Sequence, residues 1–125
     1  MIEDFVADLK AIPLVASFTG GRVFPMVSRK GYGKQFITFT PISVSQPLQF
    51  SSLGLTTQTI QVDIYSDGFG ANHEVAKVVR ARYHGFNGVL NTQTIAMAEV
   101  VGERDFIDSV DDTLYRHSMD IQFTF

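Results

Sequence analysis

The last eleven residues of the chain alternate between two kinds of side chain. Apart from one histidine, the first set is apolar or aromatic: Tyr115, His117, Met119, Ile121, Phe123 and Phe125. The residues between them are polar: Arg116, Ser118, Asp120, Gln122 and Thr124. A side-chain period of two is typical of a β-strand that buries one face. Because the alternation continues to the final residue, we expect the C-terminus to be a strand of the core sheet rather than a frayed tail.

Residue patterns in the remainder of the chain predict an α+β fold. Apolar residues at helical spacing indicate helices over residues 2–12 and 71–84, which end before Pro13 and Gly85. Alternating, β-branched and aromatic residues indicate strands over residues 35–44, 58–65, 92–101 and 115–125. This order predicts a single domain over residues 1–125, with a mostly antiparallel sheet of about four or more strands and two helices packed on one face.

Three segments between these elements lack a periodic pattern. Residues 26–34 and 45–57 are predicted to be long loops. Residues 102–113 hold five acids and one arginine, which indicates an acidic loop. Pro41 lies inside a predicted strand, where a proline indicates a sheet edge or a β-bulge.

The composition favours a protein whose surface is partly covered by partners. Hydrophobic residues make up 45% of the chain and charged residues only 18%, whereas about 25% charged residues is usual. Eleven phenylalanines are enough to fill a core and to leave some for an interface. The formal net charge of −3 argues against a module that grips nucleic-acid phosphates over its whole face. The chain has no cysteine, which excludes disulfides and Cys-ligated metals.

The N-terminal segment does not look like a targeting sequence. Acidic Glu3, Asp4 and Asp8 occupy positions where a signal peptide would be basic, and no apolar run approaches membrane-spanning length. We therefore expect a soluble protein that is made in the cytoplasm and has no membrane partner.

No residue pattern predicts catalysis or a bound cofactor. His73 and His84 are eleven residues apart, which is too far for the one-turn pairing of metal ligands on a helix. His117 lies on the apolar side of the last strand, where a packed or interface histidine is commoner than a metal ligand. We therefore expect no catalytic residue, no cofactor and no metal, and we do not expect an enzyme.

Two further motifs lack the residues that their chemistry would need. The acidic segment 105–112 has carboxylates at the wrong spacing for a calcium loop, with no internal glycine and no closing glutamate. Gly68 and Gly70 precede a helix, but a dinucleotide site would need a third glycine and a later acid. We interpret the first motif as a solvated or partner-facing loop and the second as a turn.

Two of the predicted loops carry opposite charges. Three cations give residues 26–34 a charge of +3, and five acids with one arginine give residues 102–113 a charge of −4. These charges fit ordinary surface charge or an ion-pair contact within one subunit, and they fit equally well a head-to-tail contact between subunits. On the last interpretation the interface residues are Arg29, Lys30, Lys34, Asp108, Asp111 and Asp112.

Four stretches of the chain form a recognisable series. The first two are RVFP at residues 22–25 and QVDIYS at residues 61–66. The helix pattern VAKVVRARYHGF follows at residues 75–86 with Gly88 close behind, and the last stretch is LYRHSMDIQF at residues 114–123. In this order and spacing they resemble the tail-completion or tail-terminator proteins of long-tailed bacteriophages, a family that forms rings at the head-proximal end of the tail. The resemblance covers nearly the whole chain.

The resemblance implies a structural virion protein without enzymatic activity. It would form a hexameric ring that caps the finished tail tube, halts tube growth and supplies the docking surface for the head. Its partners would be further copies of itself, the tail tube protein and a head-completion or neck protein. DNA would pass through the lumen without being read, and assembly would take place in the host cytoplasm.

Two alternatives remain at this point. The first is another ring protein of the phage neck, such as a head-completion protein or a connector adaptor. Those proteins are typically richer in helix or built as small barrels, so that the number of strands separates them from this chain. The second is a small ligand-binding α+β domain, which a buried polar cluster in a deep pocket would favour.

Overall fold

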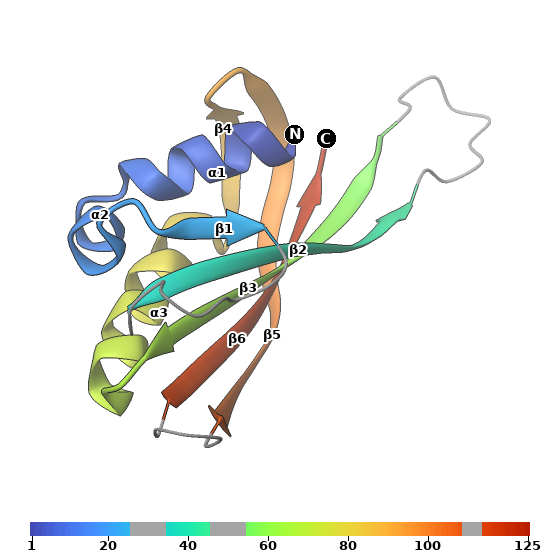
Figure 1. Ribbon diagram of the computed structural model, residues 1–125. Helices are drawn as coiled ribbons and strands as arrows, with labels where there is room; N and C mark the ends of the chain where they lie inside the picture. Colours follow the sequence, from blue (N-terminus) through green and yellow to red (C-terminus); the bar gives the residue numbers. More distant parts are fainter. Residues whose placement is uncertain (26–34, 46–54, 109–113) are drawn as a thin grey trace.

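The described part of the chain forms a curled six-stranded sheet with three helices packed on one of its faces (Figure 1). The computed structural model describes residues 1–25, 35–45, 55–108 and 114–125. No helix in this described part is both long and apolar enough to cross a membrane. In chain order the elements are α1 (Ile2–Ala11), α2 (Pro13–Thr19), β1 (Val23–Pro25), β2 (Phe36–Ser45), β3 (Thr57–Ser66), α3 (Phe69–Tyr83), β4 (Phe86–Leu90), β5 (Gln93–Asp108) and β6 (Leu114–Thr124).

The sheet is mixed, and its centre is built from strands that are distant in sequence. The strand order is β1-β2-β3-β6-β5-β4, in which β1 and β2 are parallel and every other pair is antiparallel. β6 pairs with β3 from Tyr115 to Thr124. Beyond this ladder, Phe125 and Thr56 exchange two backbone hydrogen bonds of 2.6 and 2.8 Å. The prediction that the C-terminus is a core strand is therefore confirmed.

The helices cover the face of the sheet to which the buried apolar side chains point. On β3 and β6 the fully buried residues of this face are Ile60, Val62, Ile64, Met119, Ile121 and Phe123. Phe5 of α1 and Tyr83 of α3 meet Phe123 here, with ring centroids 5.2 to 5.9 Å apart. Burying a large apolar side chain contributes roughly 1.5–3 kcal/mol, so this layer stabilises the domain by joining α1, α3 and the central strands.

The predicted fold class, a mostly antiparallel sheet with two helices, is wrong. The sheet contains a parallel pair, and it is covered by three helices. The first predicted helix is divided at Ile12, whose φ of −68° and ψ of 120° are extended. A proline disfavours the helical conformation in the residue before it, yet it suits the first turn of a new helix. Pro13 therefore ends α1 and also begins α2, which stops at Gly20 with a left-handed φ of 59°.

The segment from residue 86 to residue 108 also differs from the prediction. One strand over residues 92–101 and an acidic loop were expected, whereas the structure has the hairpin β4–β5, in which β5 continues to Asp108. β4 shows no clear alternation because Gly88, with a φ of 136°, and a register shift interrupt it. In β5 a register shift between Val100 and Gly102 changes the phase of the alternation, so that acidic residues beyond it face the helices.

Strands β2 and β3 extend past the end of β1 at one corner of the sheet, where β3 remains paired with β6 (Figure 1). We call residues 41–45 and 55–59 the arm. Among the described residues, β1 pairs with β2 only from Ile37 to Phe39. The arm begins where the register of β2 and β3 shifts between Pro41 and Ser43. The bulge predicted at Pro41 is therefore confirmed, and it lies where the missing N–H of proline can be accommodated.

Candidate functional site

The residues that the sequence predicts for a subunit interface lie largely outside the described structure. Asp108 is the last residue of β5, and its side chain is outside the description. The other five residues are outside it entirely: Arg29, Lys30, Lys34, Asp111 and Asp112. The predicted contact between the two charged segments therefore stays a prediction.

Other charges near these segments are used within the subunit. Arg22, next to the basic segment, donates two hydrogen bonds of 2.9 and 3.2 Å to the carbonyl oxygen of Gln35. This contact joins the two ends of residues 26–34. Glu103 and Asp105 belong to β5 rather than to a loop, and both are paired inside the subunit. The acidic charge that remains for a partner is thus smaller than the sequence indicates.

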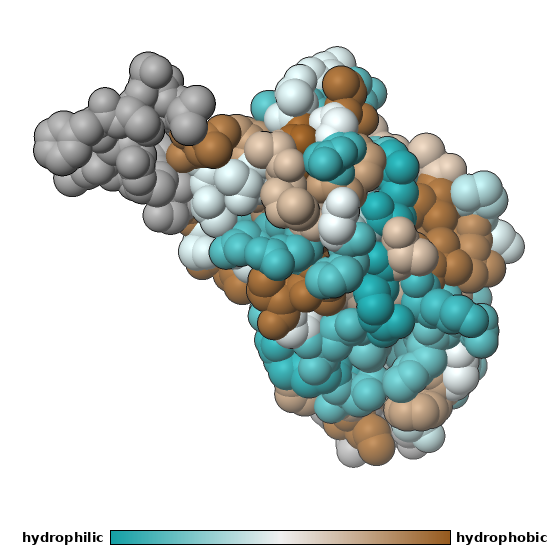
Figure 2. All heavy atoms as spheres, turned by 180° about the vertical axis from the view of Figure 1, so that it is seen from behind, coloured by the Kyte–Doolittle hydropathy of each residue, from teal (hydrophilic) through white to brown (hydrophobic). Residues whose placement is uncertain are grey.

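The arm carries exposed apolar side chains. Ile42 and Val44 of β2 are 47% and 62% exposed, and Leu55 before β3 is 39% exposed. Figure 2 shows apolar surface beside the grey atoms, where the arm leaves the body. The β3 half of the arm stays paired with β6, whereas β1 pairs with β2 only as far as Phe39 among the described residues, so that β2 is the outer strand here. Apolar surface beside an uncovered outer strand is therefore a candidate site for contact with another chain.

The face of the sheet opposite the helices carries a buried polar contact. Asp63 of β3 and Ser118 of β6 lie directly opposite each other in the ladder. The Ser118 hydroxyl donates a hydrogen bond to the Asp63 carboxylate, and the Gln61 amide donates to both of its oxygens at 3.1 and 3.2 Å. Because a buried carboxylate is stable only when hydrogen-bonded, these contacts fix the register of β3 and β6 rather than leave Asp63 available for acid–base chemistry.

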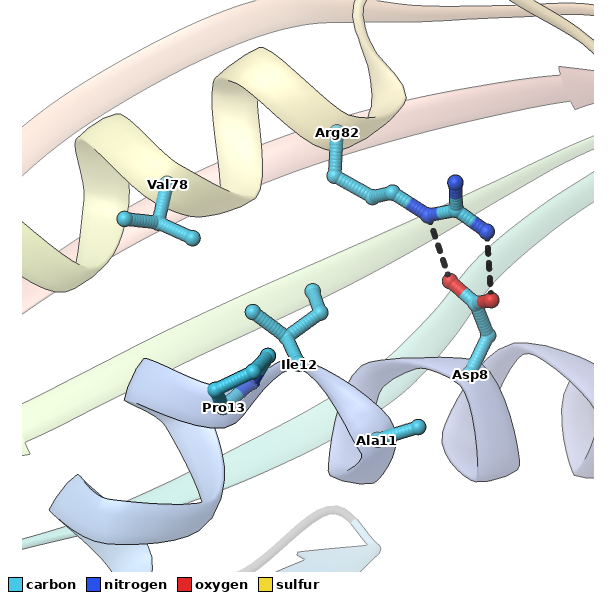
Figure 3. A pocket seen from close by; sticks show the side chains of 6 residues that line it. All are labelled: Asp8, Ala11, Ile12, Pro13, Val78 and Arg82. Carbon is cyan, nitrogen blue, oxygen red and sulfur yellow. Dashed lines mark hydrogen bonds and ion pairs between the residues drawn. The ribbon is translucent and has the colours of Figure 1, made fainter.

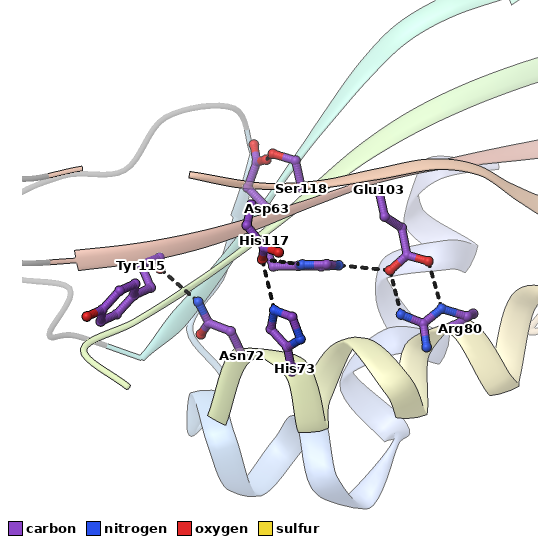
Figure 4. Close-up of polar contacts among 9 residues, drawn as sticks. Asp63, Asn72, His73, Arg80, Glu103, Tyr115, His117 and Ser118 are labelled. Carbon is purple, nitrogen blue, oxygen red and sulfur yellow. Dashed lines mark hydrogen bonds and ion pairs between the residues drawn. The ribbon is translucent and has the colours of Figure 1, made fainter. Parts of the chain in front are cut away.

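Two histidines and two carboxylates form a compact group between α3 and the sheet, which we call the histidine cluster: His73, Glu103, Asp105 and His117 (Figure 4). The His117 side chain, from β6, is only 6% exposed. Its Nδ1 lies 2.8 Å from Oδ1 of Asp105, and its Nε2 lies 2.8 Å from Oε1 of Glu103. Nε2 of His73, from α3, lies 3.0 Å from the same Asp105 oxygen. The cluster thus joins three elements of the fold.

Arg80 of α3 contacts the histidine cluster through Glu103. Its guanidinium donates hydrogen bonds of 2.6 and 2.7 Å to the two oxygens of Glu103. These bonds hold the pKa of Glu103 below its ordinary value, against the opposing effect of burial. Burial alone would raise the pKa of Asp105, but hydrogen bonds from His117 and His73 outweigh it and lower this pKa. Both carboxylates are therefore ionised at neutral pH.

A shallow hollow lies between α3 and the corner of α1 and α2 (Figure 3). Its lining residues are Asp8, Ala11, Ile12, Pro13, Val78 and Arg82. The Asp8 carboxylate accepts hydrogen bonds of 3.0 and 2.6 Å from Arg82 and one of 2.7 Å from the Tyr83 hydroxyl. Because the two charged lining residues are paired with each other, the hollow is best explained as the seam that attaches α1 to α3.

The sequence matches the family model described as tail completion protein gp17 over residues 3–125. The chain belongs to this family. Its members are structural proteins of phage tails, so the chain is a structural component of a virion. The family is generally not enzymatic. The resemblance seen in the sequence is thus confirmed.

The fold is similar to that of several solved structures. One is a chain from the virion of a native gene transfer agent (GTA) particle, with 15% sequence identity and a TM-score of 0.76 over 94% of this chain and 88% of that one. Another has 9% identity and a TM-score of 0.60 over 100% of this chain and 96% of that one. No curated protein matches the chain in sequence. At such low identities the structural likeness concerns the fold alone.

The sequence pattern did not predict the histidine cluster as a group. His73 and His117 lie 32 and 12 residues from Asp105, and each histidine was considered alone. Glu103 and Asp105 were assigned to a loop. Their spacing could have indicated this group. Glu103 and Asp105 are two residues apart, so they lie on the same face if the strand continues through them. An antiparallel pairing of this strand with β6 then places His117 opposite Asp105.

Proposed function

We propose that this protein forms a ring at the head-proximal end of a phage tail, where it ends the growth of the tail tube and provides the docking surface for the head. In this proposal residues 1–125 act as a single domain, the ring is a hexamer, and its partners are the tail tube protein and a head-completion or neck protein. DNA passes through the lumen without being read, and assembly occurs in the host cytoplasm. Family membership is the main support, since a tail completion protein acts at the end of tail assembly.

The arm is the structural observation that favours a ring. The arm of each subunit presents exposed apolar side chains beside the outer strand β2, a feature that suits a contact with a different surface of the next subunit. Such head-to-tail contacts close into a ring when the rotation between subunits allows it. The six-stranded sheet also favours this function over the helix-rich neck proteins considered as an alternative.

The arm can be tested with a charge introduced at its most exposed apolar residue. Val44→Asp should prevent ring assembly, because the contact would then bury an unpaired carboxylate. The folded subunit should keep its melting temperature, because the Val44 side chain is 62% exposed. Native mass spectrometry and light scattering, with and without purified tail tubes, would measure assembly.

Val89→Asp is a matched control, because Val89 is also a strand valine and is 61% exposed, but on β4 at the other side of the sheet. We expect this variant to assemble like the wild type. A wild-type protein that stays monomeric with tail tubes present would contradict the ring. A Val44→Asp variant that assembles normally would contradict the role of the arm while leaving the ring possible.

The oppositely charged segments provide a second, weaker contact in this proposal. Rim ion pairs contribute roughly 0–1 kcal/mol each and mainly set register and association rate. Reversing the three cations to Glu should weaken assembly, most at low salt, and reversing the three acids to Lys in the same chain should restore it. If the double reversal assembles no better than the single one, the segments do not meet. The residues to reverse are Arg29, Lys30, Lys34, Asp108, Asp111 and Asp112.

A further inference from the structure

We propose that His73, Asp105 and His117 bind a divalent transition-metal ion of the Zn²⁺ class. Two imidazoles and one carboxylate form a ligand set that suits zinc, cobalt or nickel, whereas Mg²⁺ and Ca²⁺ prefer oxygen ligands alone. The proposal concerns the isolated subunit and does not depend on the ring. The sequence spacing of the histidines gives no ligand pattern and favoured packed histidines, so the site follows from the fold alone.

The three ligand atoms already converge. Nε2 of His73, Oδ1 of Asp105 and Nδ1 of His117 lie within 4.8 Å of one another. The Asp105 oxygen is 3.0 Å from the first nitrogen and 2.8 Å from the second. Ligands about 2.0–2.1 Å from a tetrahedral zinc ion are roughly 3.3 Å apart. Small side-chain movements would therefore open the hydrogen-bonded triangle to the spacing that a metal needs.

The other nitrogen of His117 has the partner that a metal ligand usually has. A ligating histidine typically donates its second N–H to a carboxylate, which fixes the tautomer and orients the ring. Here Nε2 of His117 lies 2.8 Å from Glu103, and Arg80 holds that carboxylate with two hydrogen bonds. When a metal binds, Nδ1 would give up the proton that it shares with Asp105 and offer its lone pair to the ion, while Nε2–H donates to Glu103. This chain of contacts, shown in Figure 4, is an observation independent of the three ligands.

The site is held by two paired strands and a helix, and one side of it is open to solvent. Asp105 and His117 are paired across β5 and β6, and His73 lies in the first half of α3. The side chains of His73 and Asp105 are 43% and 42% exposed, whereas that of His117 is 6% exposed. A metal would therefore be reached from solvent, and a water molecule can supply a fourth ligand. Its effect would be to join α3 to the sheet.

Metal titration of the full-length wild-type subunit tests the proposal. After treatment with a chelator, the protein is titrated with Zn²⁺ in a calorimeter and with Co²⁺ followed by visible absorption. We expect a saturable isotherm with one ion per chain, a tetrahedral Co²⁺ spectrum and a higher melting temperature with Zn²⁺. The absence of saturable one-to-one binding would overturn the proposal, and the cluster would then be a hydrogen-bonded group only.

Variants identify the ligands. His73→Gln removes one exposed ligand and should weaken Zn²⁺ binding about 100-fold or more, whereas Glu103→Gln, which changes only the partner of His117, should weaken it about 10–100-fold. His84→Gln is the matched control: His84 follows α3, and its Nδ1 accepts a hydrogen bond from the backbone of Val100. Equal affinity of His73→Gln and wild type, or an equal loss in His84→Gln, would contradict the assignment.

A measurement on the wild type guards against variants that fold poorly. Ring-nitrogen NMR shifts report directly which nitrogen binds a metal. On addition of Zn²⁺ we expect the signals of His73 Nε2 and His117 Nδ1 to shift and those of His84 to stay. Shifts at His84 alone, or at Nε2 of His117, would overturn the proposed geometry.

Discussion

Replacing Phe123 with alanine should destabilise the subunit more than any comparable change at an exposed aromatic residue. Phe123 lies in the central strand β6 and is fully buried. Its ring centroid is 5.2 Å from that of Phe5 and 5.9 Å from that of Tyr83. The side chain therefore contacts two helices as well as its own sheet.

The size of the effect follows from this packing. Phe→Ala substitutions in cores cost about 3–5 kcal/mol, and aromatic pairs contribute about 0.5–1.5 kcal/mol beyond their buried area. The neighbours of Phe123 come from α1 and α3 and from the flanking strands β3 and β5, so no movement of a single element can fill the cavity. We expect a loss of about 4–5 kcal/mol, which is a large share of the 5–15 kcal/mol typical of a domain.

Urea denaturation followed by circular dichroism would measure this loss. With a slope of about 1–3 kcal/mol/M, the unfolding midpoint should fall by about 2 M while the slope stays unchanged. Phe69→Ala is the control, because Phe69 is 51% exposed and should cost less than about 1.5 kcal/mol. A loss below about 2 kcal/mol for Phe123→Ala, or an equal loss in the control, would refute the reasoning about the three-ring cluster.

Two further predictions concern the same body of the protein. Deleting residues 120–125 removes half of the central strand, and we expect the truncated chain not to fold; a soluble truncation that melts cooperatively would count against this. Burial alone would raise the pKa of Asp8, but the hydrogen bonds from Arg82 and Tyr83 outweigh this effect. The pKa of Asp8 in the folded state therefore lies below its ordinary value of 3.8. A depressed carboxyl pKa stabilises the fold above the unfolded value, and this contribution is lost as pH falls through the folded value. Asp8→Asn should therefore melt below wild type near pH 6, and the gap should narrow below about pH 4; a constant gap would contradict the assignment.

The sequence predicted the strands that bury one clean apolar face. β3 and β6 alternate because every second residue enters the core, and their predicted limits lie within one or two residues of the observed ones. α3 was also predicted, since its apolar stripe packs on this core. The division of the first helix was missed because Pro13 was taken only as a stop signal, although proline is equally suited to begin a helix.

The candidate site was predicted poorly because its chemistry depends on contacts between distant residues. Glu103 and Asp105 face inward from β5, and charged residues on an inward face hide the alternation that reveals a strand. Their partners Arg80 and His73 lie on α3, more than twenty residues earlier. Sequence spacing alone could not place these side chains together. The uncovered outer strand of the arm was equally hidden, because its residues follow the same pattern as the rest of β2 and β3.

The arm and the histidine cluster lie toward opposite ends of the same two strands, β3 and β6. β3 begins at the arm and ends at Ser66, directly before α3, and Ser66 lies opposite Tyr115 of β6. The Asn72 side chain on α3 donates a 2.8 Å hydrogen bond to the Tyr115 carbonyl oxygen, one residue before His73. A partner that holds the arm and a metal that binds the histidine cluster would thus both act on β3, β6 and the first turns of α3.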